Sequence, residues 1–183
     1  MIEDAKKVGK LLFDAELIDG ASGNMSFKDE KVYVTKTGSV LFDLREEDFV
    51  EVDSKFASRD RLIHKKIYEK SSHRCVIHCH GVYNVVLSMV EKEIKPVDLE
   101  GKLYFGSIEV VDGEFGSEEL ASKIANVLAK NKVVFVRGHG MYVGAESFIE
   151  AFNLSCYAEH SCKVLFHLKL FDKLHHCEGW KNL

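Results

Sequence analysis

The segment Cys75-Val76-Ile77-His78-Cys79-His80-Gly81 is the feature that most constrains what this chain can fold into. A short apolar run leads into a His-x-His pair and then a glycine, a pattern typical of a buried strand that ends at a site. Because side chains alternate between the two faces of a strand, His78 and His80 are expected to point the same way. Two imidazoles in that arrangement can share one metal ion.

A second histidine lies between two glycines, in the turn Arg137-Gly138-His139-Gly140. If this turn lies beside the strand, His139 supplies a third nitrogen, and three protein ligands with one open position form the layout of a catalytic zinc site. A His-x-His pair alone is a weak signal, and the Gly-His-Gly turn strengthens it. The alternative is that His78 and His80 lean toward the surface and that His139 belongs to an unrelated turn.

The length and charge of the chain bound its class. The 183 residues suit one domain, spanning 1–183, with a sizeable core. The chain is 46% hydrophobic and 30% charged, as in ordinary globular proteins, and its net charge of -4 argues against nucleic acid as a partner. No apolar run approaches the ~20 residues that cross a bilayer, so no membrane association is expected.

The cysteines indicate the redox compartment. Their number is odd and no C-x-x-C motif occurs, which favours a reducing cytoplasm over a secreted disulfide scaffold. They are Cys75, Cys79, Cys156, Cys162 and Cys177.

Hydrophobic periodicity predicts helices and short strands along the whole chain. The expected helices cover 2–17 (ended by Gly20), a stretch from near Ser58 or Asp60 to Lys70, 82–90, 117–130 and 147–174. One short strand is expected to end near Phe27, and the other expected strands cover 32–35, 49–52, 75–80, 108–111, 133–136 and 141–143. Residues 94–100 are expected to form a crossover. Ser58 and Ser117 are the expected helix N-caps. The pattern predicts a mixed α/β domain with antiparallel hairpins at both ends of its sheet.

A second group of polar and glycine residues precedes the His-x-His strand. Glycine lets backbone N–H groups approach a ligand closely, a helix N-terminus favours an anion, and an arginine adds positive charge. Together these residues could cradle one phosphate, although each alone is typical of an ordinary turn. The residues are Gly23, Asn24, Thr37, Gly38, Ser58 and Arg59. No G-x-x-x-x-G-K loop is present, so nucleotide binding is not indicated.

Two carboxylates are candidates for proton transfer. Asp60 is either a helix-start carboxylate that complements the helix dipole or a general base next to the metal. Glu100, in Asp98-Leu99-Glu100-Gly101, is a further candidate acid, and a solvated loop position is the alternative for it.

Six motifs, in order along the chain, resemble the class II aldolase/adducin family. They are Ser22-Gly23-Asn24-Met25-Ser26, Thr35-Lys36-Thr37-Gly38, Ala57-Ser58-Arg59-Asp60 with His64 and Ile67-Tyr68, His78-Cys79-His80, Phe115-Gly116-Ser117, and Gly138-His139-Gly140. The resemblance runs from the first predicted helix to about Phe166 and rests on the order and spacing of all six.

The resemblance implies a three-layer α/β/α domain with a mostly antiparallel central sheet, in a homotetramer with sites near subunit interfaces. It implies zinc, or another divalent ion, on His78, His80 and His139, one per subunit, and a phosphate at the polar group defined above. Asp60 matches the family's catalytic glutamate, which can also ligate the metal.

Three positions depart from the family pattern. The family's glutamate is the shorter Asp60, and the usual second serine of the phosphate site is Arg59. A tyrosine that one member lends across the subunit boundary as a proton donor is matched by position to Glu100, with Tyr104 a few residues on.

The function implied by the resemblance is reversible aldol cleavage of a ketose 1-phosphate, such as L-fuculose 1-phosphate, to dihydroxyacetone phosphate and lactaldehyde. In this scheme Asp60 moves the proton at the cleaved carbon and Glu100 or Tyr104 is the second acid. The alternatives are an epimerase of pentulose phosphates, a dehydratase or a decarboxylase on the same scaffold. A non-catalytic adducin-like interaction domain and a hydrolase using a zinc-bound water remain further alternatives.

Overall fold

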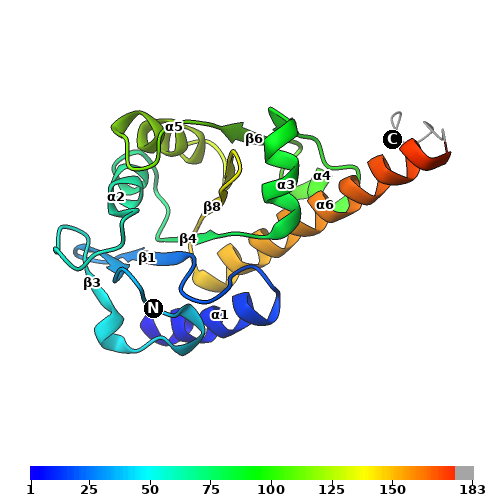
Figure 1. The fold of residues 1–183 in the computed structure, drawn as a ribbon. Coiled ribbons are helices and arrows are strands. Elements are labelled where there is room, and N and C mark those ends of the chain that lie inside the picture. The colour runs from blue at the N-terminus through cyan, green and yellow to red at the C-terminus, as the bar shows by residue number, and fades with distance from the viewer. Residues whose placement is uncertain (176–183) are drawn as a thin grey trace.

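The strands pair into one open sheet of eight strands in the order β3-β2-β1-β4-β8-β7-β6-β5. The computed structural model describes residues 1–175 (Figure 1), so Cys177 lies outside the described residues. The strands are β1 (Asn24–Lys28), β2 (Val32–Thr35), β3 (Phe49–Glu51), β4 (Cys75–Cys79), β5 (Glu93–Ile94), β6 (Ile108–Val111), β7 (Val133–Val136) and β8 (Gly140–Ala145). Within this range only β6 with β7 is a parallel pair. The sheet is therefore mostly antiparallel, as predicted.

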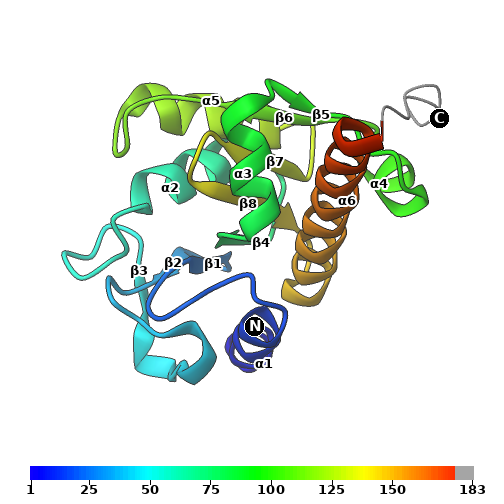
Figure 2. The same cartoon turned by 45° about the vertical axis from the view of Figure 1, so that its right-hand side comes forward.

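Helices cover both faces of the sheet. They are α1 (Ile2–Asp14), α2 (Arg61–Lys70), α3 (Val82–Val90), α4 (Leu99–Tyr104), α5 (Glu118–Leu128) and α6 (Phe148–His175), and two 3-10 turns cover Leu41–Asp43 and Glu46–Asp48. Figures 1 and 2 show α2 and α5 on one side of the sheet and α1 and α6 on the other. This confirms the predicted three-layer α/β/α architecture.

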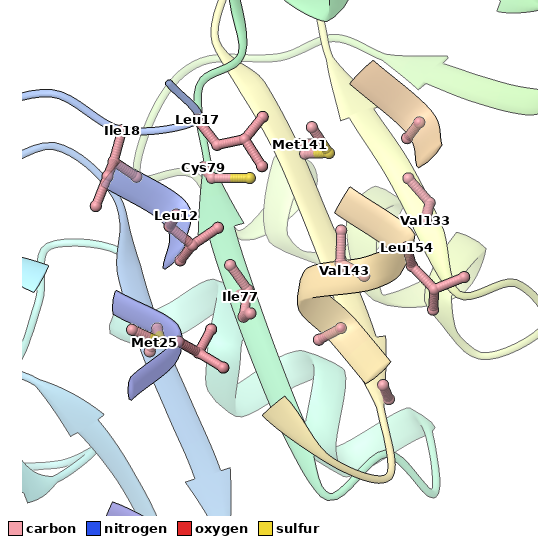
Figure 3. Packing of buried hydrophobic residues seen from close by; sticks show 14 of the residues in the cluster. Leu12, Leu17, Ile18, Met25, Ile77, Cys79, Val133, Met141, Val143 and Leu154 are labelled. Atoms are coloured by element: carbon pink, nitrogen blue, oxygen red, sulfur yellow. The ribbon is translucent and has the colours of Figure 1, made fainter. Parts of the chain in front are cut away.

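The two faces of the central strands bury different side chains. Ile77 and Cys79 of β4 point into the core that α1 and α6 cover, where Met141 and Val143 of β8 join them (Figure 3). Val76 points the other way, into a second core under α2 and α5. The period of two along β4 thus puts His78 on the α2 side of the sheet.

The first helix differs from its predicted bounds, and the second differs from the prediction in its N-cap. α1 ends at Asp14, three residues before the predicted end, and Glu16 adopts a φ of 56°. The prediction failed because Leu17 leaves the helix to be buried in the core, where its carbonyl accepts from His80 N at 2.8 Å. The expected N-cap Ser58 was also wrong, because α2 begins at Arg61 with Asp60 at the N-cap position.

Ser58 has a different local role. Its N–H donates to Thr35 O at 3.0 Å, at the end of β2, and its hydroxyl accepts from Asp60 N at 3.2 Å. Pairing with the sheet edge keeps Ser58 out of the helix. Ser117 does cap α5, since its hydroxyl accepts from Leu120 N at 3.1 Å.

The predicted crossover over 94–100 contains two elements that periodicity missed. β5 is only two residues long and α4 only six, too short for either to show a period. Glu100, expected in a loop, lies in the first turn of α4. Within residues 1–175, none of the helices combines the length and the apolar character needed to cross a bilayer.

A carboxylate from α6 closes the start of α3. Glu159 accepts from Tyr83 N at 2.7 Å and from Asn84 N at 2.9 Å, and also from the Asn84 side-chain amide at 2.7 Å. The first N–H groups of a helix have no partner within the helix, so an acidic side chain from a neighbouring element satisfies them and complements the helix dipole. Gly81 leaves room for this carboxylate, because a Cβ there would lie 2.4 Å from Glu159 Cδ.

We expect Glu159→Ala to lower the free energy of unfolding by about 1–3 kcal/mol, because α3 loses charge-assisted bonds at its buried start. Urea denaturation of the two proteins measures this difference. Glu119→Ala is the matched control, since its carboxylate is exposed and, within residues 1–175, forms an ion pair only with Lys123 on the same helix; it should cost less than about 0.5 kcal/mol. Equal losses in the two variants would contradict the assignment.

Candidate metal centre

His78 is held by the strand pairs on either side of it. In the antiparallel register it lies opposite Asn24 of β1 and opposite Tyr142 of β8, and its ring stacks on Tyr142 with centroids 4.1 Å apart. The side chain is 1% exposed. His80 follows the end of β4 by one residue and is half-buried. The prediction that both imidazoles lie on the same side is confirmed, because their Nε2 atoms are 2.7 Å apart.

The turn between β7 and β8 brings the third imidazole to the same place. His139 Nε2 lies 2.9 Å from His78 Nε2, and the ligand atoms of His78, His80 and His139 all lie within 4.8 Å of one another. Gly140 is needed for this approach, since a Cβ there would lie 2.4 Å from Cys79 O and 2.5 Å from the His80 ring. Two nitrogens from the end of β4 and a third from the distant turn between β7 and β8 therefore converge on one point.

The protonation state of these rings fits a cation. His78 Nδ1 faces Met141 O at 2.8 Å, and a carbonyl can only accept, so Nδ1 carries the proton and Nε2 presents a lone pair. Burial lowers the pKa of His78 well below its usual range, and the neighbouring His80 and His139 lower it further. Burial and His139 also lower the pKa of His80. Neutral imidazole is the form that binds a metal.

The turn that carries His139 is tied to helix α3. Ser88, fully buried on α3, accepts from Gly138 N at 2.9 Å through its hydroxyl, while its carbonyl accepts from the Arg137 guanidinium. The same hydroxyl donates to Val85 O. Because Gly138 precedes His139, this contact fixes the direction in which the third imidazole points.

Asp60 lies next to the three histidines without joining them. Its Oδ2 is 3.7 Å from His78 Nε2 and accepts from Asn24 Nδ2 at 2.6 Å. Its Oδ1 is buried and has no hydrogen-bond partner within residues 1–175. Burial by itself would raise the pKa of Asp60, but the interaction with the neighbouring His78 ring and the hydrogen bond from the Asn24 amide outweigh it and lower the pKa. The side chain is thus an ionised carboxylate whose Oδ1 makes no hydrogen bond within residues 1–175, and the nearby Tyr142 hydroxyl also lowers its pKa.

One pocket contains all the residues expected to bind metal or phosphate. It has a volume of about 380 Å³ and is lined by the three histidines, Asp60 and the six predicted phosphate residues Gly23, Asn24, Thr37, Gly38, Ser58 and Arg59. Ala21, Ser22, Lys36 and Phe115 line it as well. The two predicted groups of residues therefore form one site.

Lys36 and Phe115 are pocket residues that sequence reasoning did not assign a role. Lys36 appeared in the prediction only as part of the Thr35–Gly38 motif. Its position next to Thr37, a predicted phosphate residue, was a signal that it could lie at the same pocket. Phe115 stacks on His139 with ring centroids 5.6 Å apart and forms part of the pocket wall. No periodicity could show this, because Phe115 lies in the loop before α5. The arginine and lysine at the pocket have no ion-pair partner among residues 1–175, whereas Lys31, Lys65 and Lys132 do.

Glu100 and Tyr104 lie elsewhere. Both are on α4, outside the pocket wall of their own chain, and Figure 2 shows α4 on the far side of α6. Tyr104 stacks on Tyr157 of α6 with centroids 4.9 Å apart and is 51% exposed. The chain does not bring these two candidate acids to its own cluster of three histidines.

We expect Ser88→Ala to weaken binding of Zn²⁺ by about 10-fold, within the range seen when groups that orient metal ligands are removed. Titration of the metal-free protein with Zn²⁺ against a chelating indicator measures this. Ser71→Ala is the control, because its hydroxyl also donates to a helix carbonyl, Ile67 O at 2.8 Å, but lies outside the pocket. Unchanged affinity in Ser88→Ala would show that the turn holds His139 without this contact.

Comparison with known proteins gives a consistent assignment. A family model described as the class II aldolase and adducin N-terminal domain matches residues 3–166. An L-fuculose phosphate aldolase of Methanocaldococcus jannaschii is 32% identical over 155 residues, which cover 80% of this chain and 84% of that protein. A 3-oxo-tetronate 4-phosphate decarboxylase of Escherichia coli is 27% identical over 181 residues, covering 90% and 85%.

Among solved structures, an L-fuculose-1-phosphate aldolase from Thermus thermophilus superposes with a TM-score of 0.89 at 27% identity. The match covers 94% of this chain and 95% of the Thermus chain. The agreement over nearly the whole length of both chains matches the extent of the family model.

Proposed function

The chain belongs to the class II aldolase and adducin family, and from that premise we propose that it is a divalent-metal-dependent aldolase, a lyase that reversibly cleaves a ketose 1-phosphate. L-fuculose 1-phosphate is the proposed substrate, with dihydroxyacetone phosphate and lactaldehyde as products. The support is the name shared by the M. jannaschii and T. thermophilus relatives. The single observation that carries the proposal is the convergence of three imidazoles beside an ionised carboxylate in a pocket with two cations.

The proposed metal is zinc, or another divalent ion, held by His78, His80 and His139, one per subunit. The donor set fits, because three imidazole nitrogens and no thiolate suit zinc and similar divalent ions. When bound, such an ion would supply Lewis-acid stabilisation of negative charge on the substrate oxygen atoms.

Asp60 is the proposed proton-transfer group. Its unpaired Oδ1 and its place on the pocket wall leave one oxygen free for a substrate proton. In the synthetic direction the ionised carboxylate would remove a proton from the carbon at which the new bond forms. Cleavage is the reverse, in which the carboxyl group that has become protonated would return that proton to the same carbon. Direct ligation of the metal by Asp60 is a second role open to the same carboxylate.

The phosphate would bind at the other polar residues of the pocket. Gly38 has a φ of 83°, a backbone conformation that suits glycine and turns N–H groups toward a ligand. Thr37 and Ser58 offer hydroxyl groups, and Gly23 and Asn24 lie beside them. Arg59, with Lys36 next to Thr37, would add the charge that a phosphate dianion requires.

The second acid would come from another subunit. Glu100 and Tyr104 lie on α4, away from their own pocket, so either could act only in a pocket to which a neighbouring chain brings it. Leu99 and Leu103 of α4 are 74% and 73% exposed, which suits an apolar contact between subunits. This supports a homotetramer with sites near its interfaces.

The four cysteines within residues 1–175 are unpaired thiols, which supports the proposed location in a reducing cytoplasm. The E. coli decarboxylase among the relatives supports a second candidate, another sugar-phosphate enzyme on this scaffold, such as a decarboxylase, dehydratase or pentulose-phosphate epimerase. Asp60 in place of glutamate and Arg59 in place of serine are the positions that favour it. A non-catalytic adducin-like domain is disfavoured by the three converging histidines.

We expect His80→Ala to lose bound zinc and activity together, because one of three ligands is removed. Elemental analysis of the purified, zinc-reconstituted proteins measures the metal. His160→Ala is the control, since His160 is exposed on α6 and outside this pocket. A normal zinc content in His80→Ala would remove His80 from the ligand set.

We expect Asp60→Asn to keep its fold and its zinc while kcat for L-fuculose 1-phosphate falls by about 10²–10⁴-fold, the usual contribution of a general acid or base. A coupled assay for dihydroxyacetone phosphate and lactaldehyde measures turnover. Asp53→Asn is the control, because Asp53 lies at the surface and, in the part of the chain that the structure describes, forms an ion pair only with Lys65. Full activity in Asp60→Asn would exclude the carboxylate from the mechanism, and carbon dioxide or an epimerised pentulose phosphate as product would favour the second candidate.

A further inference from the structure

A continuous series of buried hydrogen bonds runs from the core to Asp60. Tyr68 Oη lies 2.9 Å from Ser26 Oγ, which lies 2.6 Å from His64 Nδ1. On the other side of the ring, His64 Nε2 lies 2.5 Å from Asn24 Oδ1. Asn24 Nδ2 then donates to Asp60 Oδ2 at 2.6 Å. All five side chains are buried, and none is more than 7% exposed.

The secondary structure produces this series. Asn24 and Ser26 are two residues apart on β1, so both point to the α2 face of the sheet. Asp60, His64 and Tyr68 follow one another at intervals of four along the start and body of α2, so they share the face that packs on β1. The two elements therefore interleave their polar side chains in one row.

The direction of each bond follows from the Asp60 end. A carboxylate only accepts, so Asn24 must turn its amide nitrogen toward Asp60 and its oxygen toward His64. The His64 Nε2 atom must then carry a proton. Burial lowers the pKa of His64 to about 4, so near neutral pH the ring holds one proton and its Nδ1 accepts from the Ser26 hydroxyl. The Tyr68 hydroxyl in turn donates to Ser26.

These contacts change the role that the pocket assigns to Asn24. Both polar atoms of its side chain are engaged inside the protein, Oδ1 with His64 and Nδ2 with Asp60. Rotation of the amide by half a turn would place two oxygen atoms together at Asp60, and the ring of His64 prevents this as long as Nε2–H points at Asn24. The orientation of the carboxylate beside His78 thus depends on a ring that does not line the pocket.

We propose that His64 is a positioning residue that, through the Asn24 amide, fixes the Asp60 carboxylate in the direction its reaction with substrate requires. The inference rests on the proposed function, because it assumes that Asp60 transfers the proton. The Ser26 hydroxyl, by donating to Nδ1, favours the ring form that carries its hydrogen on Nε2, and Asp60 remains the group that touches substrate.

The kinetic test is a double-mutant cycle of His64→Asn and Asp60→Asn. Asparagine is too short to reach Asn24 from the position of Nε2, whereas the longer glutamine in His64→Gln can place an amide N–H there. We expect His64→Asn to lower kcat about 10- to 100-fold, with KM, zinc content and the dissociation constant for inorganic phosphate all within about twofold of wild type. His64→Gln should recover most of kcat, and His64→Asn should cause no further loss when Asp60 is already asparagine.

The control for a general effect of losing a histidine is His73→Asn. His73 is half-buried and bonds Leu128 O at 2.9 Å, away from the pocket, so its kcat should equal that of wild type. An equal loss from His64→Asn with and without the Asp60 carboxylate would overturn the proposal. A fall in zinc content or in phosphate affinity parallel to kcat would also overturn it, in favour of a purely structural role.

A second measurement does not depend on activity or on folding of the His64 variants. In metal-free protein with ¹⁵N-labelled histidine, NMR should show the His64 ring protonated at Nε2, with slow exchange, and Ser26→Ala should weaken or shift that signal. A ring protonated at Nδ1, or exchanging freely with water, would overturn the proposal. If Asp60→Asn is fully active while the NMR result holds, the proposed function fails and the hydrogen-bond series stands. If Asp60→Asn is inactive and His64→Asn is harmless, only the further inference fails.

Discussion

The register between β1, β4 and β8 is the constraint on which the rest of the site depends. It puts Asn24, His78 and Tyr142 side by side on one face of the sheet. A slip of one residue would turn His78 into the core beneath α1 and α6 and bring Ile77 or Cys79 to the pocket. The apolar side chains on the opposite face, packed on both helices, fix this register. The hydrophobic core therefore determines where the polar chemistry can occur.

Much of this arrangement could be predicted from short sequence patterns. The rest depends on contacts between residues far apart in the chain, which such patterns do not show. The alternation in β4 predicted the shared direction of His78 and His80, and the glycines around His139 predicted a tight turn. The predicted end of α1 was wrong because Leu17 is buried in the core outside the helix. The predicted N-cap Ser58 was wrong because its backbone N–H pairs with the end of β2. β5 and α4 were missed because they are too short to show a period. The series of hydrogen bonds from Tyr68 to Asp60 was also not predicted. The four-residue intervals between Asp60, His64 and Tyr68 on one helix were visible in the sequence.

The electrostatics of the pocket differ from those of the whole chain. The protein carries a net charge of -4, yet the pocket combines three imidazoles, Lys36 and Arg59 with a single carboxylate. Elsewhere in the described part of the chain, several lysines form ion pairs with acidic side chains, as Lys31 does with Glu51. In this pocket the two cations have no ion-pair partner among residues 1–175, and the one carboxylate accepts a hydrogen bond from the neutral Asn24 amide. Such a site suits an anionic substrate that exchanges a proton with the carboxylate.

Helix α6 is 28 residues long, which corresponds to about 42 Å, and its outer end extends beyond the sheet (Figures 1 and 2). Glu159 of α6 accepts hydrogen bonds from the first turn of α3. The start of α3 follows His80 in the chain, and near its other end Ser88 bonds to the turn that carries His139. The long helix is thus connected through α3 to two of the three imidazoles. The relative placement of His80 and His139 therefore depends on a contact that α6 makes outside the pocket.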